Sequence, residues 1–394
     1  MKLMVIGFGQ CGNRIADEFA RLGKRARGWR GAEIITGALA VDTDTAALSG
    51  LSTIRPHHEQ RIAIGEAKTR GHGVGKRSEL GAEIAREEGF KIIDSVRQTK
   101  RFSETDAFLL VAGAAGGTGS GAIPIVAQLI KERYVDRPVY SLVVLPFEHE
   151  EEIEPRNIHN TAVCLKSVYS ATDAVFLIDN QRYIRKGLSL GGNIDKINRL
   201  IVEPFLGLLC AGEEKKRKHI GVTMLDAGDI VQTLSGWTAI GYGKSLLHLI
   251  TFPWDKSRHF KKKSHEIQKG IKAMDEAITE LSIQCNSKDA ARALYLLSAP
   301  KEEMYVDLVK NLGDHLRSLA PEATIRYGDY PVGRGLTDVT LVLSALKEVE
   351  KVTSYYARSA SLMEQSKRKQ EDAAGTPGVI EQAPRDTPTT SGSA

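Results

Sequence analysis

The first half of the chain alternates between continuous apolar runs and stretches whose apolar residues recur at helical spacing. The apolar runs predict strands at residues 3–7, 34–41, 106–114, 139–147 and 173–179. Helix-like stretches follow them, for example NRIADEFARL at 13–22 and AIPIVAQLIKERY at 122–134. Uninterrupted apolar strands that alternate with helices are typical of a parallel sheet covered on both faces. This pattern predicts a doubly wound α/β domain.

The second half follows a different pattern. Residues 197–214 are largely apolar and predict a buried helix, which Pro204 would kink or start. Further on, helical spacing and strand-like runs alternate over 229–346, which predicts a second α+β domain. From about residue 366 the chain is rich in Gln, Ser, Thr, Pro and Gly, which predicts a disordered tail. We expect four parts: a first domain over 1–190, a central helix over 191–220, a second domain over 221–350, and a terminal helix remnant with the tail over 351–394.

Composition is that of a soluble globular enzyme. The 394 residues are 42% hydrophobic and 26% charged, and a chain of this length can bury more than one core. The cysteines at 11, 164, 210 and 285 are far apart and form no C-x-x-C pair, which argues against a zinc site or a disulfide framework. We see no secretory signal and no apolar run long enough for a membrane span, so we expect a cytoplasmic protein.

The charge pattern gives little support to nucleic-acid binding. The net charge is +5, and the basic clusters at 213–219 and 257–265 are local. No zinc, helix-turn-helix or RNA-recognition pattern accompanies them. We interpret both clusters as solvated turns or a partner surface and expect no nucleic-acid partner.

A glycine-rich turn follows the first predicted strand. Gly7, Gly9 and Gly12 form G-x-G-x-x-G before a helix, and the amino end of a helix favours phosphate. A dinucleotide site also needs an acidic residue about 20 residues on, at the end of the second strand. Asp42 closes that strand but lies late. An NAD(P)-linked oxidoreductase and a plain strand-to-helix turn both stay open on this evidence.

A second glycine loop reduces the number of ligands that the first loop could serve. GAAGGTGSG at 113–121 also lies between an apolar strand and a helix, and it adds the hydroxyls of Thr118 and Ser120. Its backbone amides can donate to a phosphate group. A nucleoside polyphosphate held between two glycine loops explains both better than one dinucleotide. The Walker pattern is absent, so we expect Lys76 and Lys244 to be surface lysines.

Several segments resemble the tubulin and FtsZ superfamily. AGGTGSG at 115–121 is similar to its signature loop, and GQCGN at 9–13 resembles the first nucleotide loop of tubulins. The likeness continues through IEPRN (153–157), LIDN (177–180), INRL (197–200) and LDAGDI (225–230). The start and the compact length look most like the archaeal CetZ group. The resemblance implies a GTP-binding first domain, a central helix leading into an activation loop, and a GTPase-activating second domain.

The resemblance also implies a set of phosphate and metal contacts. Those to the phosphates would be Gly9, Gln10, Cys11, Gly12, Gly116, Gly117, Thr118, Gly119 and Ser120. Asp42 and Asp44 would face the γ-phosphate and Mg²⁺, which would be held through the phosphates and water, with Gln10 and Asp44 as candidate ligands. A helix cap is an equally good interpretation of Asp44. GHGVG at 71–75 would be the γ-phosphate loop.

The ribose and base contacts follow in the same way. Glu154 would accept from the ribose hydroxyls, and Arg156 would reach a phosphate. Asn180 and Asn198 would bind the guanine edge, because an amide offers both a donor and an acceptor. Ile194 stands where the superfamily has an aromatic ring on the base, so stacking is replaced by apolar contact or comes from elsewhere.

Asp226 and Asp229 are the candidate catalytic residues. Taken alone, two acids three positions apart at a helix start are favoured by the helix dipole. The resemblance implies instead that they act on the nucleotide of the neighbouring subunit. It thus implies an assembly-dependent GTPase that cycles between GTP and GDP in a head-to-tail homopolymer. Met224 departs from an FtsZ asparagine, which keeps a GTP-binding homologue with little turnover as an alternative.

The cellular role implied is control of cell shape. The tail has no equivalent of the FtsZ partner-binding peptide and none of the acidic tubulin tail. An FtsZ-type division protein remains the alternative.

Overall fold

A computed structural model describes residues 1–184, 190–214, 220–245, 258–333 and 336–375. Its strands are β1 Leu3–Phe8, β2 Ile35–Asp42, β3 Arg61–Ala63, β4 Ala107–Gly113, β5 Val139–Leu145, β6 Ala174–Asp179, β7 Gly236–Ser245, β8 Ala290–Pro300, β9 Thr324–Val332 and β10 Thr337–Leu346. Its α-helices are α1 Gly9–Arg30, α2 Thr45–Ser49, α3 Glu66–Thr69, α4 Ser78–Gln98, α5 Thr118–Arg133, α6 Glu148–Ile153, α7 Arg156–Ala171, α8 Leu190–Val202, α9 Pro204–Cys210, α10 Ala227–Thr233, α11 Arg258–Thr279, α12 Val306–Leu319 and α13 Glu350–Gly375. The expected tail over 376–394 and residues 215–219 and 257 of the two basic clusters lie outside the described residues.

The strands form one continuous sheet in the order β3-β2-β1-β4-β5-β6-β7-β10-β8-β9. The first six are parallel to their neighbours, in the doubly wound order 3-2-1-4-5-6. Strand β7 pairs parallel with β6 and antiparallel with β10, so the sheet passes directly from the first half of the chain into the second. The predicted α/β first domain and α+β second domain are confirmed.

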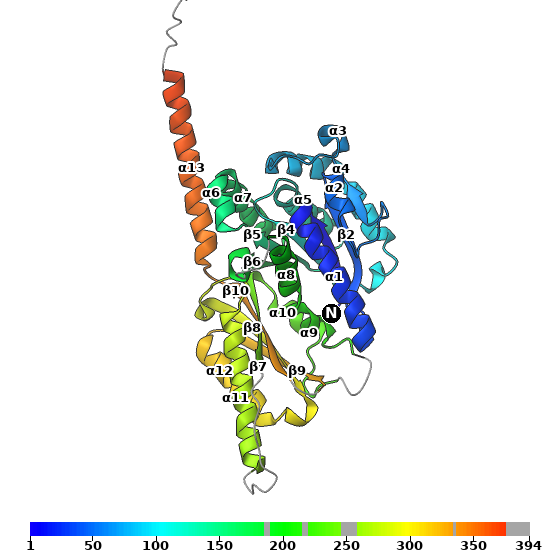
Figure 1. Ribbon diagram of the computed structural model, residues 1–394, viewed down its shortest axis with the longest axis vertical. Helices are drawn as coiled ribbons and strands as arrows, with labels where there is room; N and C mark the ends of the chain where they lie inside the picture. The colour runs from blue at the N-terminus through cyan, green and yellow to red at the C-terminus, as the bar shows by residue number, and fades with distance from the viewer. Residues whose placement is uncertain (185–189, 215–219, 246–257, 334–335, 376–394) are drawn as a thin grey trace, which may run out of the picture.

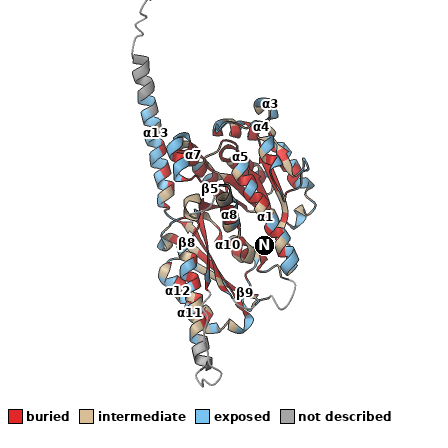
Figure 2. Ribbon diagram, in the orientation of Figure 1, coloured by how far each residue is buried: buried red, intermediate tan, exposed pale blue. Residues whose placement is uncertain are grey.

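Helices cover both faces of this sheet (Figure 1). In β1, Met4, Ile6 and Phe8 point into one core, while Leu3 and Val5 point into the other, as the two-residue repeat of a strand requires. Helices α1, α8 and α9 close the second core, and α4, α5, α7 and α11 close the first. Figure 2 shows the resulting buried interior. Within the described residues, no helix combines the length and apolar character needed to cross a membrane.

Strand β7 was not predicted, because its glycines lower strand propensity. The structure gives Gly241 a packing reason. A Cβ at Gly241 would lie 2.0 Å from the carbonyl oxygen of Ala277 in α11, so the helix could not approach the strand as closely. The predicted apolar stretch at 197–214 is split: α8 ends at Val202, and α9 begins at Pro204, where proline is well tolerated. The predicted domain limits remain predictions.

The C-terminal helix is longer than expected. Helix α13 continues to Gly375, so the prediction of a short helix remnant and of a disordered tail from about residue 366 is wrong for 366–375. Residues 364–374 read EQSKRKQEDAA, and most of these residue types favour a helix even without apolar contacts. Figure 1 shows α13 passing beside α7 and then extending beyond the body of the protein.

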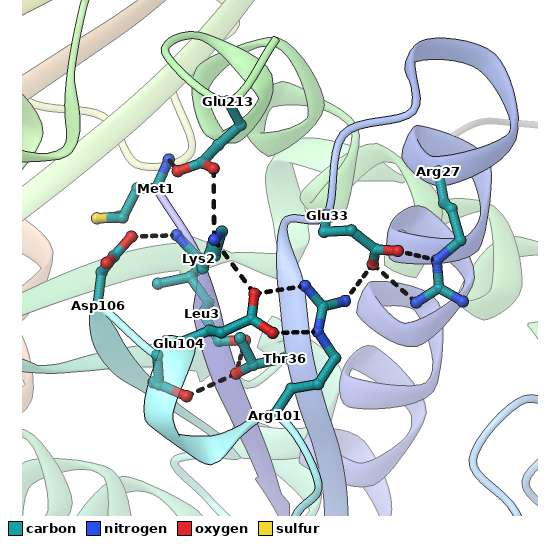
Figure 3. A network of polar contacts seen from close by, with 11 residues as sticks. Met1, Lys2, Leu3, Arg27, Glu33, Thr36, Arg101, Glu104, Asp106 and Glu213 are labelled. Atoms are coloured by element: carbon teal, nitrogen blue, oxygen red, sulfur yellow. Dashed lines mark hydrogen bonds and ion pairs between the residues drawn. The ribbon is translucent and has the colours of Figure 1, made fainter. Parts of the chain in front are cut away.

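A polar network joins the segments at the amino ends of the strands (Figure 3). The Met1 amino group lies 3.0 Å from Glu213 Oε1 and donates to the Leu209 carbonyl oxygen. Arg101 bridges Glu33 and Glu104. The Met1 contacts attach the start of β1 to α9 and to the segment that follows it. They lie at the end of the sheet opposite the glycine loops.

Gly12 is expected to be essential for folding because of its position against β4. A Cβ there would lie 2.1 Å from the Val111 carbonyl oxygen, and neither backbone can yield. Gly12→Ala should lower the free energy of unfolding by about 3 kcal/mol or prevent folding. In the same helix, Gly28 has no atom near its missing Cβ. Gly28→Ala should therefore raise stability by up to about 1 kcal/mol. Urea unfolding followed by circular dichroism compares the two, and equal stabilities would contradict the packing argument.

Candidate nucleotide-binding site

Two helix amino ends meet at one edge of the sheet. Strands β1 and β4 are parallel neighbours, so α1 begins beside α5 where these strands end. The backbones touch: a Cβ on Gly9 would lie 3.0 Å from the Gly119 nitrogen. Both helices turn their unpaired N–H groups and positive dipole ends toward the same space. The arrangement is suited to a chain of phosphates.

A pocket of about 480 Å³ opens at this edge. Twelve of the predicted site residues line it: Gly9, Gln10, Cys11, Asp42, Asp44, Gly116, Gly117, Thr118, Gly119, Asn180, Ile194 and Asn198. The loop at 72–75 lines it as well. A larger groove of about 870 Å³ lies between α4, α5 and α7, but the amino end of α1 does not reach it. The smaller pocket is therefore the candidate site.

Two predicted phosphate contacts are placed elsewhere. Gly12 does not line the pocket, because it serves the packing of α1 on β4. The Ser120 hydroxyl donates to the Gly116 carbonyl oxygen one helical turn back, and the residue lines the groove behind α5. Thr118 does line the pocket, and its hydroxyl lies 2.6 Å from that of Thr43. Of the two predicted hydroxyls, only that of Thr118 belongs to a pocket-lining residue.

Glu154 and Arg156 are also not among the lining residues. Glu154 pairs with Lys76 at 2.6 Å, and Arg156 pairs with Glu79 at 2.9 Å. The glutamate that lines the pocket in this region is Glu150, in the short helix α6 that follows β5. The signal that could have found it is the position of PFEHEE directly after an apolar strand, where parallel strands present their ligands.

Other lining residues were missed or misjudged. Lys76 is exposed, as expected, but it also lines the pocket and holds Glu154 at its rim. Arg14 adds a second cation to the lining, and Asn157 a buried amide. Phe147 supplies an aromatic ring that lines the same pocket as Ile194. An aromatic ring thus lines the pocket from the segment between β5 and α6 rather than from α8.

Asp42 is buried beside the phosphate loops. Its carboxylate accepts from the backbone N–H groups of Thr43 and Asp44, at 2.8 and 3.2 Å, and from Asn13 Nδ2 at 3.0 Å. Burial raises the pKa of Asp42 to about 6, against these hydrogen bonds. A nearby cation would favour the ionised form. Asp42 is therefore poised to respond to a metal ion brought in with phosphates.

The structure confirms that Asp44 is a helix cap, and its contact with phosphate or Mg²⁺ stays a prediction. Asp44 lines the pocket, and its Oδ1 accepts from the N–H groups of Ala46 and Ala47 to cap α2. In the described part of the chain, no group of three or more His, Cys, Asp or Glu side chains is placed to hold a metal ion by itself.

Cys11 has no reactive character. It lines the pocket, but burial raises the pKa of its thiol to about 12. The thiol is therefore protonated at neutral pH, and its sulfur lies 3.4 Å from where a Cβ of Gly113 would stand. Cys11 acts as a packing residue between the two loops.

Asp226 and Asp229 do not line the pocket of their own chain. They form a capping box at the start of α10: Asp226 accepts from the Asp229 N–H at 2.8 Å, and Asp229 accepts from the Asp226 N–H at 3.4 Å. Asp229 also lies 3.3 Å from Arg326 Nε. Leu225, just before them, packs on Gly212 near the Met1 amino group, at the opposite end of the sheet from the glycine loops.

A doubly wound sheet with two helix amino ends at one pocket is an arrangement typical of nucleotide-binding proteins. Residues 2–186 match the Tubulin/FtsZ family, GTPase domain, and residues 187–361 match the tubulin-like CetZ C-terminal domain. The chain is 32% identical to CetZ1 of Haloferax volcanii over 370 residues, which cover 89% of this chain and 90% of that protein. It is 28% identical to CetZ of Thermococcus kodakarensis, covering 91% and 87%. The chain belongs to the tubulin-like CetZ family.

Solved structures agree with this assignment. The GDP-bound CetZ1 monomer of Haloferax volcanii superposes with a TM-score of 0.77 at 28% identity, covering 92% of this chain and all of that one. The CetZ2 protofilament structure with GTPγS gives 0.80 at 26% identity, covering 93% and 100%. An FtsZ structure from M. jannaschii gives 0.67 at 22% identity, covering 88% and 91%, and shows the shared fold.

The raised pKa of Asp42 gives a test in the nucleotide-free protein. Because the fold favours its protonated form, its contribution to stability is complete below its ordinary pKa of 3.8 and is lost as the pH rises through about 6. Relative to Asp42→Asn, the wild type should lose about 2 kcal/mol of unfolding free energy between pH 4.5 and 7. Urea unfolding of both proteins across this range measures the difference. If the unfolding free energies of the two proteins changed in parallel with pH, Asp42 would have its ordinary pKa in the folded protein.

Proposed function

We propose that this chain binds GTP in the pocket between the two glycine loops. Backbone N–H groups at the starts of α1 and α5 would hold the phosphates. Glu150 would accept from the ribose hydroxyls, and Asn180 and Asn198 would bind the guanine edge. Phe147 and Ile194 would enclose the base. The GDP-bound CetZ1 structure and the GTPγS-bound CetZ2 structure support a guanine nucleotide here.

Mg²⁺ fits the acidic side of this pocket. Asp42, Asp44 and Gln10 line it close to the phosphate loops and offer oxygen ligands, which Mg²⁺ prefers. We propose that these groups hold the ion through the phosphates and through water. When bound, it would neutralise charge on the phosphate chain. Asp42 would then be ionised, since the ion offsets the cost of burying its charge.

The main support for hydrolysis between subunits is that Asp226 and Asp229 are separated from the pocket of their own chain. The pocket gathers phosphate donors and cations, whereas these acids lie at the other end of the sheet, where a second molecule can meet them. We propose that the next subunit brings Asp226 and Asp229 to the γ-phosphate, where they orient the attacking water. The phosphate loops of the first subunit stabilise the charge that develops. Each catalytic site is then complete only at a junction.

Such a junction joins two unlike surfaces. One is the end of a subunit that carries the glycine loops, and the other is the end of the next subunit that carries Asp226 and Asp229. A contact of this kind does not close on itself and propagates into a filament. The CetZ2 protofilament structure supports this assembly for a relative with the same fold. We therefore propose a cytoplasmic protofilament-forming GTPase with a role in cell shape. An FtsZ-type role in division is the alternative, and loss of the protein tests it: altered outline with normal division supports the first role.

A second candidate function is GTP binding with little turnover. Asp229 is held by Arg326 and by the capping box, and Met224, 55% exposed, stands beside these acids. If contact with the next subunit does not free Asp229 from Arg326 and from the capping box, hydrolysis would be slow. A single-turnover measurement on assembled protein distinguishes this candidate from an active GTPase.

The rate of GTP hydrolysis per molecule should rise with protein concentration. Asp226→Asn should reduce turnover at least about 100-fold while leaving the affinity for GTP unchanged, because asparagine still caps α10 but cannot attract a proton from water. Phosphate release and fluorescent-nucleotide binding measure the two properties. A rate per molecule that stays constant on dilution would reject the proposal.

Mixing two inactive variants should restore activity if the site is shared. Asp226→Asn keeps the pocket and loses the acid, whereas Asn198→Ala weakens the pocket and keeps the acid. In a mixed filament, the second variant can present Asp226 to GTP bound by the first. Recovery of turnover only in the mixture is the expected result. If every mixture stayed inactive although mixed filaments formed, a site within one subunit would be favoured.

A further inference from the structure

Helix α13 turns a row of polar side chains toward the nucleotide-binding half of the protein. Lys351, Tyr355, Arg358 and Ser359 are spaced so that they share one face of the helix. Each has a partner on another element, whereas most of the described length of α13 is exposed (Figure 2). Helix α13 packs along α7, as Figure 1 shows. This pattern raises the question of what the four contacts hold in place.

The strongest of these contacts holds helix α6. Glu151 is the buried residue of α6, 5% exposed, and both of its carboxylate oxygens are bound by α13. The Tyr355 hydroxyl donates to Oε1, and Arg358 donates to Oε2 at 2.6 Å. Burial and the hydrogen bond to Glu151 hold the pKa of Tyr355 far above its ordinary value, so the phenol stays a donor. A buried carboxylate without these partners would be unstable in its place.

Helix α6 makes other contacts as well: the Phe147 N–H donates to Glu150 Oε2 at 2.9 Å, and Asn157 Nδ2 donates to the Glu150 carbonyl oxygen at 2.6 Å. The five residues of α6 other than Glu151 are exposed, and they include Glu150, which lines the nucleotide pocket. Phe147, just before α6, lines the pocket too. Glu151 is thus the buried side chain through which α6, and with it Glu150, docks on the body, whereas Phe147 is held by its own burial in the hydrophobic core.

A second contact reaches the base side of the pocket. Lys351 Nζ lies 2.7 Å from Asp179 Oδ1 at the end of β6. Asp179 is 6% exposed and caps the turn that begins with Asn180, by accepting from the Gln181 N–H. Asn180 lines the pocket. Two of the partners of α13 thus lie one residue from a pocket-lining side chain.

We propose that α13 positions the nucleotide site, with Tyr355 and Arg358 holding α6, and so Glu150, against the bound nucleotide. The inference rests on the proposed GTP-binding function and adds a residue set that does not touch the ligand. Its consequence is that loosening α13 speeds the release of nucleotide.

Two variants that each delete one hydroxyl from the same face of α13 test this role. Tyr355→Phe removes the donor to Glu151. Ser359→Ala removes a contact with His159 Nδ1, 3.2 Å away in α7, which does not line the pocket. The release of a fluorescent GDP analogue from full-length protein, below the concentration at which it assembles, is the measurement. We expect release at least about fivefold faster in Tyr355→Phe and within twofold of wild type in Ser359→Ala.

The double variant Glu151→Gln/Tyr355→Phe checks that the effect passes through Glu151. The double variant should release nucleotide no faster than the faster of the two single variants, Glu151→Gln and Tyr355→Phe, because both substitutions break the same contact. If Tyr355→Phe does not fold, Arg358→Gln replaces it, since Arg358 is partly exposed. Unfolding measurements on both hydroxyl variants distinguish a positioning role from a loss of general stability. If the variants are less stable but release nucleotide at the wild-type rate, the proposal is overturned. Failure of the wild type to bind the analogue would instead overturn the proposed function.

Discussion

The close approach of two backbones underlies the whole site. Helices α1 and α5 start side by side because β1 and β4 are parallel neighbours, and the chains come so near that a methyl group at Gly12 would strike the Val111 carbonyl group. This contact turns two helix amino ends into one cradle. The pocket, the burial of Asp42 and the packing role of Cys11 all follow from it, because each depends on how tightly the two loops meet.

The unbroken sheet determines how the two ends of the molecule relate. Since β7 pairs with both β6 and β10, the second domain is fixed to the first by hydrogen bonds rather than by a linker. Asp226 lies at the end of this sheet opposite its own pocket. Under the proposed function, a neighbouring molecule would supply the acids, which connects the fold to assembly.

Charged residues near the pocket are largely committed to one another. Lys76 holds Glu154, and Glu79 holds Arg156. Glu151 is held by α13. These pairs leave Glu150 as the carboxylate that lines the pocket on this side. The nucleotide site is consequently built on a frame of ion pairs, and part of that frame belongs to the C-terminal helix, far away in the sequence.

The sequence by itself determined the parallel sheet, both glycine loops and the family, because strand periodicity, glycine spacing and loop composition are local properties. It also gave Asn180 and Asn198, which directly follow a strand or lie in an amphipathic helix. Only the tertiary structure placed Glu150 rather than Glu154 at the pocket, turned the Ser120 hydroxyl toward the Gly116 carbonyl oxygen, and gave β7 its place. Those outcomes depend on which partner each side chain meets, and partners distant in sequence, such as Tyr355 for Glu151 or Ala277 for Gly241, leave no local pattern.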